Sequence, residues 1–101
     1  MSLSSDGQYD DTLGDGYVAG AISVSTTQVE AKVGASRLTG REYVRVFNNS
    51  SGTIYFGPSG VTIATGEPLF KNQWVSIPLG DIAIFLIAAS SLTDIRIQEF
   101  A

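Results

Sequence analysis

Apolar and polar residues alternate along most of this chain with a period of two, a pattern typical of β-strands that turn one face toward a core. No stretch repeats apolar residues at helical spacing for more than two turns. Turn-forming residues, mainly Gly, Pro, Asn and Ser, separate the alternating runs. The predicted strands are 17–25, 28–33, 42–47, 53–56, 61–64, 73–79, 82–88 and 94–100.

These strands predict an all-β fold, namely a single antiparallel β-sandwich of about seven or eight short strands. A jelly-roll-like arrangement stays open, because periodicity carries no information on strand order. The strands 42–47 and 53–56 flank a strong turn signal at 48–52 (Asn-Asn-Ser-Ser-Gly), which predicts a β-hairpin. The run 82–88 is apolar on both faces, which indicates a strand covered on its second face by loops of this chain or by another subunit.

Charge divides the chain into two parts. Residues 1–16 contain four Asp and no Lys or Arg, whereas acids and bases balance in the remainder, so the net charge of −4 lies entirely in the first part. We therefore expect a flexible acidic N-terminal arm (1–16) followed by a β-sandwich domain (17–101). A neutral domain with an acidic arm is poorly suited to phosphate contacts, so we expect no nucleic-acid partner.

The longest apolar run is far shorter than the roughly 20 residues that a membrane-spanning helix needs, and we expect no membrane association. The first residues lack a basic start followed by an apolar stretch, so we expect no signal peptide and synthesis in the cytoplasm.

Little in the composition supports catalysis. The chain has no Cys and no His, which removes disulfides, thiolate chemistry and the commonest general base and metal ligand. The segment 57–62 resembles a phosphate loop but lacks the Gly-Lys-Ser/Thr ending, and the acids of the arm lack calcium-loop spacing. Neither Lys32 nor Lys71 is spaced to activate a serine. We expect no enzyme, no cofactor and no metal site.

The aromatic residues indicate a binding surface instead. In the strands 42–47 and 53–56, Tyr43, Phe47 and Tyr55 alternate with aliphatic residues and share a face with Arg45. Tyr, Phe and Arg are enriched at protein–protein contacts, so this face is predicted to be an exposed, partner-binding patch. The alternative is that the aromatic side forms the core.

Two further elements could meet a partner. The single Trp, Trp74, either stacks on a sugar or closes one end of the sandwich. The arm is expected to become ordered on contact with a basic surface, through Asp10 and Asp11 among its acids. The candidate partner-binding residues are therefore Tyr43, Arg45, Phe47, Tyr55, Trp74, Asp10 and Asp11.

Residues 29–100 resemble small β-sandwich virion structural proteins of tailed bacteriophages. The motifs are mostly turns and strand ends. In chain order they are Lys-Val-Gly-Ala-Ser-Arg-Leu at 32–38, Gly-Arg at 40–41, Val-Arg-Val-Phe-Asn at 44–48, Ile-Tyr-Phe-Gly-Pro-Ser-Gly-Val-Thr at 54–62, Gly-Glu-Pro-Leu at 66–69, the apolar strand 82–89 and Ile-Arg-Ile-Gln-Glu at 95–99.

The resemblance implies a non-enzymatic virion component, first of all a capsid decoration or cement protein made in the host cytoplasm. Its partner would be the major capsid protein or another virion protein, bound at a symmetry axis by a homo-oligomer, with a trimer favoured. Repetition of each contact around the axis would add up modest affinities and stabilise the head. The alternatives are a tail, connector or baseplate accessory protein, and a carbohydrate- or receptor-binding module built on Trp74 and the tyrosines.

Overall fold

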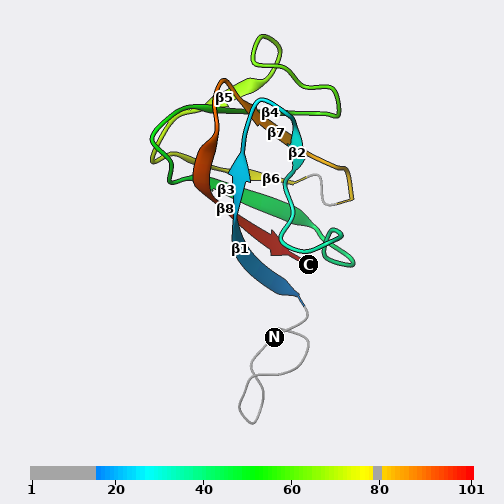
Figure 1. The fold of residues 1–101 in the computed structure, drawn as a ribbon. Coiled ribbons are helices and arrows are strands. Elements are labelled where there is room, and N and C mark those ends of the chain that lie inside the picture. Colours follow the sequence, from blue (N-terminus) through cyan, green and yellow to red (C-terminus); the bar gives the residue numbers. More distant parts are fainter. Residues whose placement is uncertain (1–15, 79–80) are drawn as a thin grey trace.

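The computed structural model describes residues 16–78 and 81–101, which form two four-stranded antiparallel sheets packed as a sandwich (Figure 1). Sheet A has the order β1-β8-β3-β6 and sheet B the order β2-β7-β4-β5. The predicted all-β sandwich is thereby confirmed. The predicted arm lies outside the described residues except for Gly16. The strands are β1 (Tyr17–Val24), β2 (Val29–Glu30), β3 (Tyr43–Asn48), β4 (Ile54–Gly57), β5 (Glu67–Leu69), β6 (Trp74–Ile77), β7 (Phe85–Ala88) and β8 (Leu92–Phe100).

The core lies between the two sheets and follows the alternation of the strands. In β3, Val44 and Val46 are completely buried, whereas Tyr43, Arg45 and Phe47 face outward from sheet A and are half-buried. Burial of each large aliphatic side chain contributes about 1.5–3 kcal/mol. The alternative in which the aromatic side of this strand is the core is therefore wrong. The buried cluster comprises Val24, Ala31, Val44, Val46, Ile54, Leu69, Ile77, Ile84, Leu86, Ala88, Leu92, Ile95 and Ile97.

The predicted hairpin between β3 and β4 is wrong. β3 pairs with β6 and β8 in sheet A, whereas β4 pairs with β5 and β7 in sheet B. The turn exists, but it carries the chain from one sheet to the other. The buried amide of Asn48 holds it, because Nδ2 donates to the carbonyls of Gly52 and Leu69, and Oδ1 accepts the Ser50 amide N–H. Inward and outward residues alternate in both flanking strands whether the chain returns in the same sheet or crosses to the other one. The sequence pattern therefore does not distinguish a hairpin from a crossing between sheets.

Two more local predictions are corrected. The predicted strand 61–64 is a turn, in which the amide of Thr65 donates to the carbonyl of Thr62 and their hydroxyls lie 3.0 Å apart. The residues that follow, where the alternation predicts no strand, form the edge strand β5. An edge position tolerates proline because one side of the strand has no partner that needs its N–H.

A buried ion pair fastens the long connection between β2 and β3 to the end of the sandwich. Arg41 Nη1 lies 2.7 Å from Glu99 Oε2, and both side chains are almost fully excluded from solvent. Glu99 belongs to β8, where its neighbours Ile95 and Ile97 point to the same core. Backbone groups add further hydrogen bonds: the amides of Val33 and Leu38 donate to Glu99, and the carbonyls of Ala31 and Ile82 accept from Arg41.

The outer face of sheet B is partly covered by the chain's own 58–66 loop. A Cβ placed on Gly57 of β4 would lie 2.9 Å from Val61 Cγ2, and Val61 is buried. Gly60 donates its amide N–H to Gln28 Oε1, beside β2. The loop therefore covers the outer side of β4 and reaches the start of β2. The outward side chains of β7, Phe85 and Ile87, stay half-buried, and Ile82 is 56% exposed, so the second face of the run 82–88 is only partly covered.

Candidate functional site

The outer face of sheet A gathers five of the ten aromatic residues of the chain. The antiparallel register places outward side chains in three rows across the strands, because residues two apart on each strand share a face. We call this surface the aromatic face. Its rows are Tyr17–Phe100–Tyr43, Ala19–Gln98–Arg45–Ser76 and Ala21–Arg96–Phe47–Trp74.

The first row is a packed set of rings. The rings of Tyr43 and Phe100 stack with centroids 4.4 Å apart and an interplanar angle of 9°. Tyr17 packs on the other side of Phe100 at 4.9 Å, and its hydroxyl accepts a hydrogen bond from Gln98 Nε2 at 3.0 Å. These contacts hold the rings in place before any partner arrives, which lowers the entropy lost on docking.

The second row holds a cation between rings. The Arg45 guanidinium carbon lies 4.7 Å from the Trp74 ring centroid and 5.9 Å from that of Phe100, within the range of cation–π attraction. Its Nε is buried without a hydrogen-bond partner, and no salt bridge to Arg45 is found within residues 16–78 and 81–101. Arg45 is therefore a preoriented donor that lacks an anionic acceptor in the described structure.

The second arginine of the face is already engaged. Arg96 binds both carboxylate oxygens of Asp94, at 3.0 and 3.1 Å, and Asn49 Nδ2 donates to the same carboxylate at 2.6 Å. These hydrogen bonds, first that of Arg96 and then that of Asn49, hold the pKa of Asp94 below its usual 3.8. Arg45 and Arg96 thus differ: the first has no acceptor in the described structure, whereas the second is neutralised locally.

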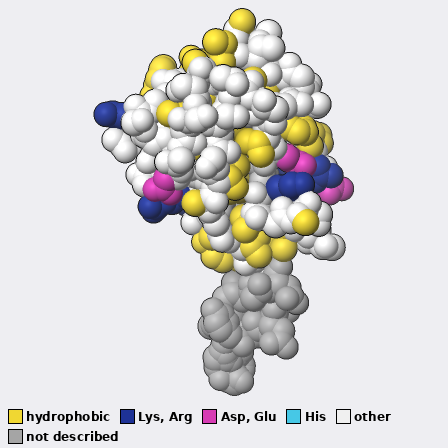
Figure 2. Space-filling model, viewed as in Figure 1, with side chains coloured by type: hydrophobic (Ala, Val, Ile, Leu, Met, Phe, Trp, Pro, Cys, Tyr) yellow, Lys and Arg dark blue, Asp and Glu magenta, His cyan; other side chains and the backbone are white. Residues whose placement is uncertain are grey.

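A shallow hollow of about 250 Å³ lies at the end of the face nearest Trp74. It is lined by Arg45, Phe47, Trp74, Arg96 and Gln98. Trp74 is 58% exposed although it is the largest side chain of the surface. A large exposed ring beside two guanidinium groups has the composition of a protein-binding hot spot. The face of the molecule seen in Figure 2 carries few charged side chains, and these occur mostly in small groups of both signs.

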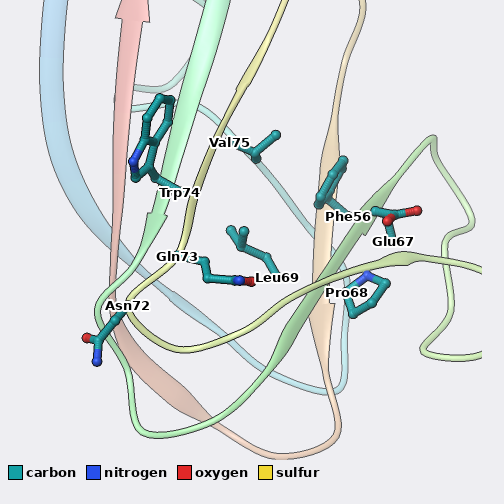
Figure 3. Close-up of a pocket in the computed structure, with 8 residues that line it drawn as sticks. All are labelled: Phe56, Glu67, Pro68, Leu69, Asn72, Gln73, Trp74 and Val75. Carbon is teal, nitrogen blue, oxygen red and sulfur yellow. The ribbon is translucent and has the colours of Figure 1, made fainter.

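Beside this hollow, a groove of about 450 Å³ separates the edge strands β5 and β6. Figure 3 shows Trp74 and Val75 on opposite sides of β6, as expected for successive residues of a strand. Leu69 and Phe56 line the groove from sheet B, and Glu67 is its acidic residue. Trp74 borders both the groove and the hollow, so it stands at the rim between the aromatic face and the open side of the sandwich.

The structure brings together four of the predicted partner-binding residues, Tyr43, Arg45, Phe47 and Trp74. The grouping of Tyr55 with them is wrong, because Tyr55 belongs to β4 and points outward from sheet B. A Cβ on Gly66 of the covering loop would lie only 2.8 Å from Tyr55 Cβ, so this tyrosine is half-buried beneath the loop.

Two of the predicted partner-binding residues, Asp10 and Asp11, lie outside the described residues. Sequence reasoning missed Tyr17, Arg96, Gln98 and Phe100. The alternation of β8, in which Arg96, Gln98 and Phe100 interleave with buried residues, was the available signal. It assigns a face but does not reveal that β8 lies between β1 and β3.

The described structure shows no chemical centre of another kind. In residues 16–78 and 81–101, no group of three or more Asp or Glu side chains is placed to hold a metal ion. Within the same ranges, no helix is long and apolar enough to span a membrane. Comparisons with protein-family models, with curated proteins and with solved structures found no match to this chain.

Proposed function

We propose that this chain is a non-enzymatic docking protein that binds another protein through the aromatic face. The observation that carries the proposal is Arg45, which is held between aromatic rings without an acidic partner in the described structure, beside the exposed Trp74. When a partner covers this surface, Arg45 can form a hydrogen-bonded ion pair with an acidic group of the partner, and the Trp74 ring becomes buried. Both changes stabilise the complex. The outer face of sheet B is partly covered by the chain's own 58–66 loop and therefore offers less free surface to a partner.

The proposed setting is the virion of a tailed bacteriophage, with the chain as a decoration protein on the major capsid protein lattice. This part rests on the resemblance of residues 29–100 to small virion proteins. A rigid sheet face suits attachment to a preformed lattice, because neither surface must rearrange. A symmetric oligomer, with a trimer at three-fold positions as the favoured form, would multiply the contact.

Co-sedimentation with undecorated heads tests the proposal. The heads would be assembled from the major capsid protein of the phage that encodes the chain, and the stoichiometry measured from the pellet. We expect saturable binding at a fixed ratio. Trp74→Ala should weaken binding about 30-fold, since hot-spot side chains contribute about 2 kcal/mol or more.

Phe70→Ala is the matched control. Phe70 is an aromatic residue of similar exposure, 54% against 58% for Trp74, but it lies in the turn between β5 and β6 and outside the aromatic face. Its loss should leave binding unchanged. Equal effects of both variants, or no binding by the folded wild type, would refute docking on the head through this face. Binding to purified tails instead of heads would support the tail accessory alternative.

A second candidate function follows from Trp74 alone. An exposed indole beside the amide of Gln98 and the guanidinium of Arg96 could stack on a sugar and bind its hydroxyls. A glycan array with wild type and Trp74→Ala separates the two functions. Retention of a glycan that is lost in Trp74→Ala, together with no binding to virion proteins, would replace docking by glycan recognition.

A further inference from the structure

The aromatic face and the first residues of this chain carry opposite charges. Residues 1–16 contain Asp6, Asp10, Asp11 and Asp15 and no basic residue. The aromatic face carries Arg45 without an acidic partner in the described structure, while Arg96 is balanced by Asp94. The acidic segment can therefore supply the negative partner that Arg45 does not have among the described residues, and it belongs to the same molecule.

The point at which the chain enters the sandwich is fixed close to this face. Gly16 accepts a hydrogen bond from the amide of Ala101 at 2.8 Å, and the next residue, Tyr17, already stands in the first row. Tyr43 shares that row on β3, and Arg45 follows two residues later on the same strand. With strands about 4.8 Å apart and a rise of about 3.3 Å per residue, Arg45 lies about 12 Å from Tyr17 along the surface.

This distance selects which aspartates can reach Arg45. The six-residue span from Asp11 to Tyr17 extends to about 20 Å, which is enough to cover the path with slack. The backbone span from Asp15 extends to only about 7 Å and stays about 5 Å short of the Arg45 backbone. The longer span from Asp6 also reaches, but a longer tether lowers the effective concentration of its carboxylate at the face. Asp10 and Asp11 are adjacent, so one of them can meet the guanidinium whichever face of the segment turns inward.

The receiving site has the groups that a carboxylate needs. The guanidinium of Arg45 presents donors in a fixed fork, and no carboxylate of the described residues pairs with it. The Trp74 ring on one side keeps the guanidinium in place and shields a bound carboxylate from water. A tethered segment of this length also acts at a high effective concentration, which compensates for the weak affinity of a single contact.

We propose that residues 1–15 bind the aromatic face of their own copy, with Asp10 or Asp11 at Arg45, and that a docking partner must displace them. The inference rests on the proposed function, because it makes the same face the docking surface. The segment would act as an internal competitor that lowers the affinity for single, weak contacts. A lattice that offers many sites at once would overcome it, so attachment to an assembled surface would be favoured over binding to stray subunits.

The single tryptophan makes the face observable in the full chain. Acrylamide quenching of Trp74 fluorescence would be compared in the wild type and in Asp10→Asn/Asp11→Asn. At about 0.01 M salt, we expect the quenching constant of the wild type to be about twofold lower than that of Asp10→Asn/Asp11→Asn. At about 1 M salt, where the Debye length is about 3 Å, the two constants should be equal. Asp6→Asn/Asp15→Asn removes the same number of charges and should retain the protection.

Two further arms establish the contact and its source. In an Arg45→Gln background, Asp10→Asn/Asp11→Asn should cause no additional change in quenching. Protection that is independent of protein concentration over a hundredfold range assigns the segment to its own copy; protection that grows with concentration would assign it to another copy and overturn the proposal. Equal quenching of the wild type and both double variants at low salt would also overturn it.

Co-sedimentation with heads separates this inference from the proposed function. Release of the competitor in Asp10→Asn/Asp11→Asn should tighten head binding, by about threefold if two thirds of the free copies are occupied. Weaker head binding by this variant would place the aspartates on the capsid and overturn the inference while docking stands. Protection of Trp74 without any head binding would refute the proposed function but keep the contact between segment and face.

Discussion

The buried pair of Arg41 and Glu99 allows a sharp test of what stabilises the sandwich. The substitution Glu99→Gln keeps the size of the side chain but removes its charge, so no cavity complicates the result. Each carboxylate oxygen accepts hydrogen bonds: Oε1 from the amide of Val33, and Oε2 from Arg41 Nη1 and the amide of Leu38. A glutamine offers one carbonyl oxygen and one NH₂ group. In either orientation, at least one of these donors therefore faces another donor.

The expected loss can be estimated from these contacts. Removing one member of a buried ion pair costs about 3–5 kcal/mol, because the other charge stays buried without compensation. The carbonyls of Ala31 and Ile82 still accept from Arg41, which places the expected loss near the lower end, about 3 kcal/mol. Domains of this size unfold with about 5–15 kcal/mol, so the variant should fold but with a markedly lower midpoint.

Urea unfolding followed by far-UV circular dichroism measures this loss. The m value should stay unchanged, because the same surface is exposed on unfolding. Asp94→Asn is the control, since it neutralises a carboxylate in an exposed ion pair and should change stability little. A loss below about 1 kcal/mol for Glu99→Gln would refute the reasoning, since it would mean that the charge of Glu99 contributes no more than an ordinary neutral hydrogen bond.

Two other predictions concern the covering loop and the surface carboxylate. Gly66→Ala should lower stability by about 1–3 kcal/mol in thermal unfolding, because the new Cβ would lie 2.8 Å from Tyr55 Cβ. Gly34→Ala is the control and should be nearly neutral, because the nearest atom to its new Cβ would be 3.9 Å away. Equal unfolding midpoints of the two variants would contradict the tight packing at Gly66. An NMR titration should give Asp94 a pKa below 3.8. The stabilisation that its charge provides is therefore present above pH 3.8 and is lost as the pH falls through the folded-state pKa. Arg96→Ala should move the pKa of Asp94 back toward 3.8, and no movement would show that Arg96 is not the cause.

Alternation predicted which side chains point inward, and the reason is local. The side chains of successive strand residues point to opposite sides of a sheet, so buried Val44 and Val46 place Tyr43, Arg45 and Phe47 outside whatever the strand order is. Three members of the aromatic face could therefore be predicted from one strand alone.

Strand pairing was beyond the same reasoning, because it depends on packing between distant parts of the chain. Trp74 joins the aromatic face only because β6 pairs with β3, which places it opposite Phe47. Tyr55 does not belong to the aromatic face, because the turn after Asn48 carries the chain from sheet A to sheet B. No pattern within either segment distinguishes these outcomes.

The order of sheet A bears on how the protein folds during synthesis. β8 is the last strand in the sequence, yet it lies inside the sheet between β1 and β3, and β1 has no other neighbour there. β1 must therefore wait for β8 during synthesis, and sheet A cannot be completed before residue 100 has left the ribosome. Such long-range pairing predicts slow folding, with the apolar side of β1 exposed until β8 arrives.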